Sequence, residues 1–592
     1  MSHKDYQQGY SLSEVLKDLP TPKTKPIVVG PPISGLNFWN KPSEINDNET
    51  PRCKNARIHR GYVEPRPGLV SFKSGFDSTI LYIQEFVLAN GSIYHVVITQ
   101  KSIYTSLDFS TYIRVPWYYI VGTVTITGTS VNVVGTDTLW VANVRAGDRF
   151  KLDSDSTWWT VQTVADNTHL TLTTTHPACS GVAYHIDKYF GGTLTDPFWS
   201  QVIGDVDYLT FSQGIDPVLY LNSTVDEVRR LSVDCPTAKY GVIYADRLII
   251  AGLTNLPFRA KWCARGLYTD WTGIGSGYKD FVEDPFSING LSVISGVATV
   301  YKEYSICHMT ETGRSDNPFD FKTRVPGIGC YFPGSLLSIG NADAFIGSDN
   351  FYTYDLQSPT SIGDKVKDRY FSIVNPDSAD VNHGMVAEEF NEAQWFFSSG
   401  ANISPDKVWT YNYDLEVFSS EWDMAANASG YATQQTSKAW DSMVGTWDAQ
   451  TEVWDSSQLQ AAVPLNLIGR GTSLYKQDPT AVDDEGVNFE FEWWTKEFRS
   501  DQLKMMSVYR VVVEYYCSVA ATLKVGISGD GGTNFHAEIN QTLVVGAELK
   551  RAFFDFICTY NTVIVRLQCN DGGRFQIVKV YIQSIESGEI LE

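Results

Sequence analysis

Long apolar runs are missing from this 592-residue sequence, and cysteine is sparse. No stretch approaches the ~20 consecutive apolar residues that a membrane-spanning helix needs, so we expect no membrane span. The nine cysteines are odd in number and form no Cys-x-x-Cys motif, which argues against a clustered metal site or a disulfide framework. We interpret them as reduced thiols that fill core space in a chain folding in a cytoplasm. The N-terminal residues also lack the apolar stretch of a signal peptide.

Positive charge is scarce as well. The chain has 46 Lys and Arg residues against 68 Asp and Glu residues, which gives a formal net charge of −22. A surface of this sign repels phosphate groups and has no basic footprint for tight nucleic-acid binding. It suits instead a wall past which a polyanion moves without sticking.

The common catalytic motifs are also absent. The sequence contains no HExxH, GxSxG, P-loop or Rossmann fingerprint. His308 lies beside Cys307, and we interpret this pair as core packing. Acidic neighbours such as Glu388-Glu389 are typical of solvated loops, whereas a glycosidase needs two convergent carboxylates. We therefore predict that the protein is not an enzyme and has no catalytic, cofactor-binding or metal-binding residues.

Turn-forming and aromatic residues are abundant. The chain has 46 glycines and 24 prolines, and 13% of its residues are aromatic. From about residue 80 onward, short segments that alternate apolar and polar residues, or are rich in β-branched and aromatic residues, follow one another between turns. The sequence predicts an all-β protein.

Residues 1–79 have a different character. Ser11 and Glu14 form a capping box for one short helix, and Pro20 marks its end. The Pro-rich stretch that follows predicts an extended N-terminal arm. Two interpretations stay open: the arm lies across a neighbouring subunit, or it straps its own domain.

A weak repeat recurs along the middle of the chain. Each copy is an apolar strand, a short polar turn, and then an apolar residue followed by Tyr. The pairs are Ile103-Tyr104, Leu219-Tyr220, Phe351-Tyr352 and Leu474-Tyr475, with Ile306-Cys307 as a looser match. Position 352 follows 307 by 45 residues, and a period of about 40–50 residues is typical of β-propeller blades. We predict a propeller of six to eight blades, formed by residues 80–120 and 188–487.

Two further β domains accompany the predicted propeller. Residues 121–187 contain at least five short strands and interrupt the repeat, which favours a small inserted β-barrel whose closure satisfies its strand edges. Residues 488–592 alternate cleanly between apolar and polar side chains. This pattern predicts a C-terminal β-sandwich in which each sheet buries one face.

A Trp-Asp pair occurs three times in a short segment, at Trp440, Trp447 and Trp454. The spacing would align the three rings on one helix face, but Gly445 and nearby β-branched residues weaken a helix. A WD40 blade carries one such pair in about 40–45 residues, and a calcium site needs denser oxygen ligands. We interpret the segment as short strands or turns anchored by buried Trp side chains, a structural role.

The stretch SGDGGTNF resembles an Asp-box, with the pattern S-x-D-x-G-x-x-aromatic at Ser528, Asp530, Gly532 and Phe535. In sialidases and other β-proteins this motif is a hairpin turn in which Asp oxygens bind backbone N–H groups. We interpret it as a structural turn rather than a glycan-binding site.

Several segments resemble proteins of phage tails. The segment that begins GLNFWNKPSEINDNE leads to a G-x-x-x-x-R-P-G turn at Gly61, Arg66, Pro67 and Gly68. The inserted GTVTITGTSVNVVGTDTLW is similar to a small β module of phage tail and fibre proteins. The segments ADRLIIAG, VYKEYSICHMTETG and FIGSDNFYTYD resemble the propeller of the tail nozzle (tail tubular protein B-like) family of short-tailed bacteriophages. The resemblance extends to about residue 478.

This resemblance implies a structural virion protein: a homohexameric nozzle ring that extends the DNA channel below the portal and the adaptor protein. Such a ring retains the genome, passes it during ejection without binding it specifically, and holds tail fibre or spike proteins. It would be located in the virion tail and assembled in the host cytoplasm, with no cofactor. The alternative is a receptor- or glycan-binding phage tail protein built on a β-propeller.

Overall fold

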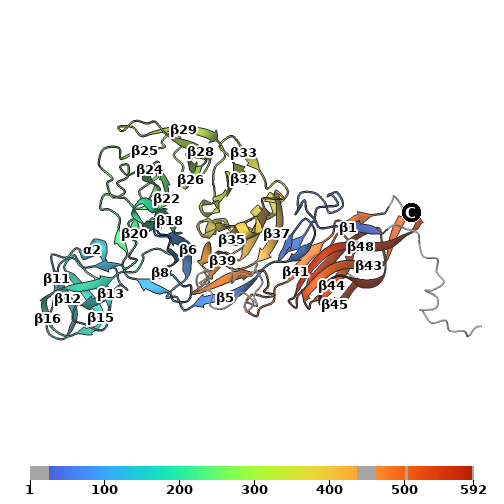
Figure 1. The fold of residues 1–592 in the computed structure, drawn as a ribbon, viewed down its shortest axis with the longest axis horizontal. Coiled ribbons are helices and arrows are strands. Elements are labelled where there is room, and N and C mark those ends of the chain that lie inside the picture. The colour runs from blue at the N-terminus through green and yellow to red at the C-terminus, as the bar shows by residue number, and fades with distance from the viewer. Residues whose placement is uncertain (1–25, 436–461, 501–503, 536, 590–592) are drawn as a thin grey trace, which may run out of the picture. The chain divides into compact units, whose positions relative to one another are not determined.

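The structure, a computed structural model, describes residues 26–435, 462–500, 504–535 and 537–589. Strands dominate, which confirms the predicted all-β class (Figure 1). The chain forms two compact units. One comprises Pro67–Val487, and the other combines Met1–Arg66 with Asn488–Glu592.

The first unit is a β-propeller of seven blades, within the predicted range of six to eight. Each blade is an antiparallel set of four strands in sequential hydrogen-bonded order, and the seventh blade takes its fourth strand from the start of the unit. The blades are β6 (Ile80–Val87), β7 (Ile93–Thr99), β8 (Ile103–Ser106), β9 (Ile113–Val115); β18 (Trp199–Ile203), β19 (Tyr208–Ser212), β20 (Leu219–Leu221), β21 (Arg229–Arg230); β22 (Ala238–Tyr244), β23 (Arg247–Leu253), β24 (Leu256–Trp262), β25 (Gly277–Asp280); β26 (Ile288–Ile294), β27 (Val297–Lys302), β28 (Ser305–Glu311), β29 (Phe319–Pro326); β30 (Leu337–Ile339), β31 (Ala342–Ile346), β32 (Phe351–Tyr354), β33 (Pro359–Ser361); β34 (His383–Ala387), β35 (Glu392–Phe397), β36 (Lys407–Asn412), β37 (Val417–Asp423); and β38 (Ala428–Gln435), β39 (Ala462–Arg470), β40 (Ser473–Asp478), β5 (Gly68–Ser74).

The ring is closed by strands from both ends of the unit. The first strand of the last blade, β38, lies beside β6 of the first blade, and β5 pairs with β40 from Gly68↔Asp478 to Ser74↔Ser473. The propeller therefore begins at Pro67 and not at residue 80, where we expected the arm to end. The sequence pattern did not reveal this strand because its partner lies some 400 residues away along the chain.

The repeat marks the third strand of a blade in all five cases. In four of them the first residue of the pair packs toward the next blade and the second toward the previous one; Ile103, for example, lies in the core shared with β18–β21, and Tyr104 packs against the last blade. Leu219 and Tyr220 show the opposite orientation. A shift of one residue exchanges the two faces of a strand, so this copy of the repeat is offset by one position.

Residues 118–187 form an antiparallel sheet of eight strands around a core of their own. Its pairing order is β10-β17-β13-β14-β15-β12-β11-β16. These elements are β10 (Tyr118–Tyr119), β11 (Thr123–Ile126), β12 (Ser130–Thr136), α2 (Trp140–Asn143), β13 (Arg149–Leu152), β14 (Trp159–Val164), β15 (His169–His176), β16 (Cys179–Val182) and β17 (Tyr184–Asp187). No pairing joins the end strands β10 and β16 in this described segment, but both ends of the order contribute to one core around the buried Trp140. Side-chain packing rather than a closed ladder therefore completes the predicted barrel.

The second unit contains two antiparallel sheets with buried apolar side chains on both, as expected for a sandwich. One has the order β3-β4-β48-β43-β46, with β1 also on β48, and the other has β2-β41-β47-β44-β45, with β42 also on β47. Their bounds are β1 (Ile27–Val29), β2 (Cys53–Lys54), β3 (Ala56–Ile58), β4 (Val63–Pro65), β41 (Phe491–Trp494), β42 (Phe498–Arg499), β43 (Lys504–Val519), β44 (Thr522–Ser528), β45 (Ala537–Thr542), β46 (Gly546–Tyr560), β47 (Thr562–Cys569) and β48 (Arg574–Glu589).

The described part of the predicted arm straps its own unit. Strand β1 pairs with β48 at Ile27↔Ile582, and β2 pairs with β41 at Cys53↔Trp493. Of the two interpretations of the arm, residues 26–66 thus follow the second. The short helix predicted near Ser11 lies outside the described residues.

Helices are short and lie between strands. They are α2, α3 (Lys367–Ile373), η1 (Gly204–Val206), η2 (Pro333–Ser335), η3 (Pro376–Val381) and η4 (Glu388–Phe390). In α3 the side chain of Tyr370 is fully buried and contacts the rings of Phe351 and Phe397. This contact anchors α3 to the core between two blades.

Candidate functional site

The axis of the propeller contains a pocket of about 330 Å³. Its walls come from the first strands β6, β18, β22, β26, β34 and β38 and from the segment that leads into β30. The polar side chains among its lining residues are Tyr82, Ser200, Gln201, Lys239, Tyr240, His383 and Ser429. Because all seven blades contribute residues to its walls, this pocket exists only when the ring is closed.

Glycines keep this axial pocket narrow. A Cβ atom on Gly241 of β22 would lie 2.2 Å from the ring of Trp199 in β18, and one on Gly384 of β34 would lie 2.9 Å from Leu337. The first strands can therefore approach closely only where the side chain is absent.

His383 is the most unusual polar group of the axial pocket. Its Nδ1 lies 3.1 Å from the carbonyl oxygen of Val381 and its ring stacks on Phe396, whereas its Nε2 is buried with no hydrogen-bond partner among the described residues. Burial lowers the pKa of His383 to about 4, so the imidazole is neutral at neutral pH. With Nδ1–H donating to Val381, Nε2 is left as a hydrogen-bond acceptor.

The remaining polar groups of the axial pocket are neutral donors and acceptors apart from Lys239. The Oγ of Ser200 lies 3.3 Å from the hydroxyl of Tyr82, and burial raises the pKa of Tyr82 and of Tyr240. None of the described residues that line the pocket is Asp or Glu. The arrangement can hold a small neutral group by hydrogen bonds, but this lining lacks the pair of carboxylates used in glycoside hydrolysis.

The Asp-box residues form a tight turn between β44 and β45. The Asp530 Oδ1 accepts hydrogen bonds from Ser528 Oγ (2.7 Å) and Asn534 N (2.9 Å), and Ser528 Oγ accepts one from Gly532 N (3.0 Å). The Phe535 ring lies 5.0 Å from that of Trp494, and the Arg566 guanidinium lies 4.1 Å above it.

Gly532 is required in this turn by its conformation and by space. Its φ is +88°, and a Cβ atom would lie 2.3 Å from the Trp494 ring. Through these hydrogen bonds and ring contacts, all four Asp-box residues stabilise the turn.

Trp440, Trp447 and Trp454 lie outside the described residues, between β38 and β39. The neighbouring Trp409 of β36 and Trp422 of β37 are described, and both are fully buried.

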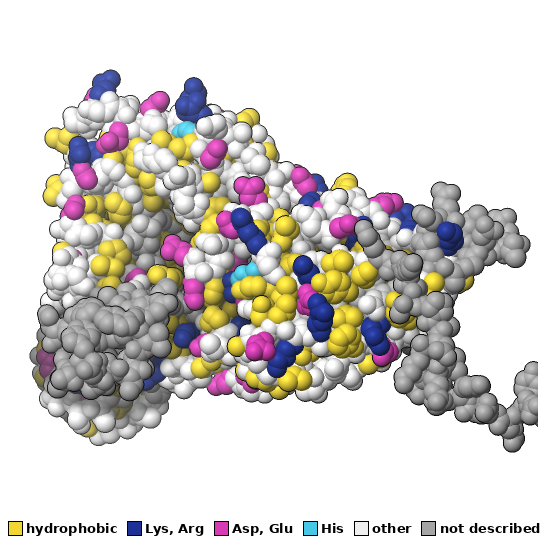
Figure 2. Space-filling view, turned by 45° about the vertical axis from the view of Figure 1, so that its right-hand side comes forward, with side chains coloured by type: hydrophobic (Ala, Val, Ile, Leu, Met, Phe, Trp, Pro, Cys, Tyr) yellow, Lys and Arg dark blue, Asp and Glu magenta, His cyan; other side chains and the backbone are white. Residues whose placement is uncertain are grey.

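One edge of the second unit exposes an unusual row of apolar side chains. Strand β46 ends the order of its sheet, and its exposed face carries Leu549, Phe553 and Ile557. Phe553 is 52% exposed and Ile557 is fully exposed, while Phe554 on the opposite face is buried. On the face that Figure 2 shows, hydrophobic side chains likewise gather between charged ones. Side chains alternate between the two faces of a strand, so the sequence spacing could have indicated this row. Apolar residues in a strand are, however, ordinarily interpreted as core residues.

Other possible sites are limited in the described part of the chain. It contains no group of three His, Cys, Asp or Glu side chains placed to hold a metal ion. All nine cysteines are free thiols, seven of them buried. Among the described helices, none has the length and apolar character required to cross a bilayer.

No protein family and no curated protein matches this sequence. Among solved structures, the chain is similar to PorZ of the Porphyromonas gingivalis type-IX secretion system (TM-score 0.26, 9% identity, 66% of this chain and 44% of PorZ). It is also similar to YCF48 from Cyanidioschyzon merolae (TM-score 0.24, 6% identity, 70% of this chain and 99% of YCF48) and to an exo-β-1,3-galactanase from Phanerochaete chrysosporium (TM-score 0.19, 9% identity, 94% and 100%). The chain thus spans under half the length of PorZ.

Proposed function

We propose that this protein is a structural subunit of a phage tail, the nozzle ring that extends the DNA channel below the portal and its adaptor. In this role it retains the genome and passes it during ejection. The sequence segments that resemble the tail nozzle family support the proposal, and so does the propeller with an inserted β module in which those segments lie.

The observation that carries the proposal is the apolar row on β46. Covering a side chain such as Phe or Ile contributes roughly 1.5–3 kcal/mol, and exposed apolar patches mark interaction surfaces. We assign this face to the neighbouring copy of the chain in the ring. The ion pairs Arg510–Asp555 and Arg551–Glu514 flank the row and would set the register of the contact.

The charge of the chain fits a passage for DNA. Six copies carry a formal total of −132, six times the −22 of one chain, and an acidic wall repels phosphates. The axial pocket of about 330 Å³ has the size of a small-molecule site, so in this proposal the duplex runs through the centre of the ring and not through the propellers.

Negative-stain microscopy of the purified protein, alone and with its adaptor, tests the proposal. We expect rings for the native chain and for Ile403→Asp, which changes an exposed apolar residue of the propeller. We expect single subunits for Phe553→Asp and Ile557→Asp. Immunogold labelling of intact particles should place the protein at the tail.

The rival function is a receptor- or glycan-binding tail protein. It predicts capture by host polysaccharide in a pull-down, and β46 variants that bind as the native chain does. A protein that stays monomeric with its adaptor and never localises to virion tails contradicts the nozzle proposal.

A further inference from the structure

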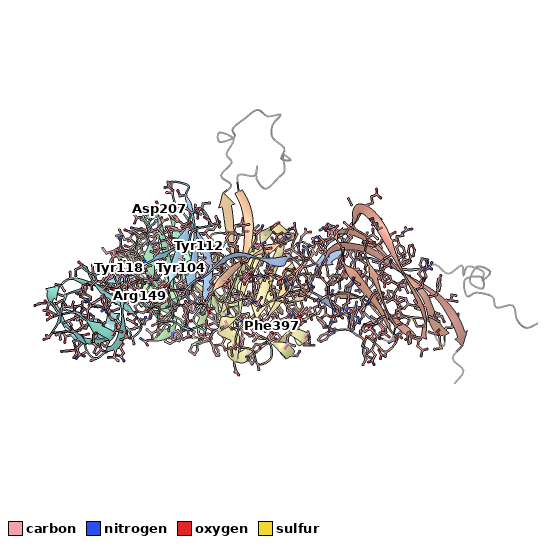
Figure 3. All side chains as sticks on the ribbon, turned by 90° about the horizontal axis from the view of Figure 1, so that it is seen from below. Tyr104, Tyr112, Tyr118, Arg149, Asp207 and Phe397 are labelled. Atoms are coloured by element: carbon pink, nitrogen blue, oxygen red, sulfur yellow. The ribbon has the colours of Figure 1, made fainter. Side chains whose placement is uncertain are left out.

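A second pocket, which we call the junction pocket, lies where the insertion meets the propeller. It has a volume of about 390 Å³, within the range of small-molecule sites. Its walls come from β10, from α2 and the residues after it, and from the loop and strand around β21. Tyr118 of β10 and Arg149 of β13, labelled in Figure 3, both lie beside Asp187, the residue at which the insertion returns to the propeller.

Cations outnumber carboxylates in the junction pocket, although the chain as a whole is strongly acidic. The charged lining residues are Arg145, Lys188, Arg229 and Arg230 against Asp216 and Glu227. Each carboxylate is paired with one arginine: Asp216 with Arg145 at 2.6 Å and Glu227 with Arg229 at 2.7 Å. Lys188 and Arg230 are left, and within the described residues neither has a carboxylate within 4 Å.

Lys188 is held in an environment that a lysine ordinarily avoids. Its side chain is more than nine-tenths buried, and its Nζ lies 3.6 Å above the ring of Trp117. No hydrogen bond of this ammonium group is formed with any described residue. A buried ammonium group with no carboxylate in direct contact is costly, and a cation–π contact offsets only part of that cost.

Arg230 of β21 is the second cation of the lining that lacks a paired carboxylate. Its guanidinium donates to the carbonyl oxygens of Ser232 (2.9 Å) and Val233 (3.0 Å), which fix its position without neutralising its charge. Two fixed cations facing one small cavity are the chemistry that binds an oxyanion. The apolar parts of the lining, among them Val141 and Pro217, suit a compact carbon skeleton.

We propose that the junction pocket binds a small ligand that carries a carboxylate or phosphate group, with the oxyanion placed between Lys188 and Arg230. The ligand supplies Lys188 with a counter-charge in direct contact, whereas Asp216 and Asp148 act on it only over a longer distance. This site is independent of the ring contact on β46 and does not rest on the proposed function.

Isothermal titration of the full-length protein tests the proposal with inorganic phosphate, glucuronate and neutral glucose. We expect phosphate or glucuronate to bind at concentrations up to about 10 mM, and glucose not to bind. Tighter binding of glucuronate than of phosphate identifies the ligand as an acidic sugar or similar carboxylate, and the reverse order identifies a phosphate compound.

Lys188→Met and Arg230→Ala should each weaken this binding at least about tenfold. Arg230 is solvent-exposed, so its variant keeps the fold even if the buried substitution does not. Arg265→Ala is the matched control, because Arg265 pairs with Asp246 at 2.7 Å and lies outside the lining. Its affinity should equal that of the native chain.

A second readout is the pH dependence. Burial lowers the pKa of Lys188 to about 8. The positive charges of Arg145 and Arg230 lower this pKa further, whereas the negative charges of Asp216 and Asp148 raise it. Affinity should therefore fall as the pH rises past about 8, and Lys188→Met should lack this fall. The proposal is overturned if neither anion binds the native protein, or if both pocket variants bind as it does.

Discussion

Replacing Asp187 should release the insertion from the propeller. This carboxylate is fully buried and accepts hydrogen bonds from Arg114 of β9 (2.5 and 3.1 Å), from Arg149 of β13, and from the backbone N of Trp117 (3.3 Å). It therefore joins the first blade to the insertion through one group. Asp187→Ala would leave Arg114 and Arg149 without the carboxylate that both of them contact.

The size of the effect follows from the burial of the three groups. Removing one partner of a buried ion pair costs about 3–5 kcal/mol. The side chains of Arg114 and Arg149 are 18% and 32% exposed, so water offsets part of the loss and we expect the lower end of that range. Since about 1.4 kcal/mol is a factor of ten, the population of the opened state should rise about a hundredfold.

Native-state hydrogen exchange, read separately for peptides of residues 118–187 and of the other blades, measures this opening. The matched control is Asp166→Asn, which removes an exposed carboxylate of the same insertion that pairs with His169. The control should exchange as the native protein does. Unchanged protection in Asp187→Ala would refute the reasoning that this carboxylate holds the junction together.

Three further predictions concern stability. Leu69→Ala, in the strand that closes the ring, should cost about 2–5 kcal/mol in chemical unfolding, whereas Val70→Ala on the exposed face of the same strand should change little; equal effects would contradict the closure. Gly532→Ala should destabilise the second unit more than Gly531→Ala, because both residues have positive φ but only a Cβ atom at 532 would clash with the Trp494 ring. Equal decreases in melting temperature for the two variants would contradict this steric explanation. Burial raises the pKa of Asp343 to about 6, above the ~3.9 of an unfolded chain, so its contribution is fully present below about pH 4 and is lost as the pH rises through 6. Relative to Asp343→Asn, the native protein should therefore lose about 2–3 kcal/mol of stability between pH 4 and pH 8, and parallel pH profiles would contradict this assignment.

The blades were predictable because their signal is local. An apolar residue followed by Tyr places one side chain on each face of a strand, and in a propeller both faces are buried against neighbouring blades. This is why Phe351 and Tyr352 share a pattern with Leu474 and Tyr475 and occupy the same third strand. The Asp-box turn was predictable for the same reason, since Ser528 and Asp530 bond to groups within a few residues.

The strand from Gly68 to Ser74 could not be assigned in this way. Its own residues are equally compatible with an arm, and only its pairing with β40 makes it the last strand of the ring. The junction pocket and the axial pocket could not be predicted from the local sequence either, because segments far away in the chain bury Lys188 and His383.

The amino-acid sequence by itself determined the strands and their alternation, because these depend on neighbours two to four residues apart. The spacing of its repeat, 45 residues between positions 307 and 352, also indicated the approximate length of a blade. Tertiary structure alone decided the number of blades, the closure of the ring and the position of each cavity. Those features arise from pairings across hundreds of residues, and the burial that gives a side chain its chemistry exists only after such pairings have formed.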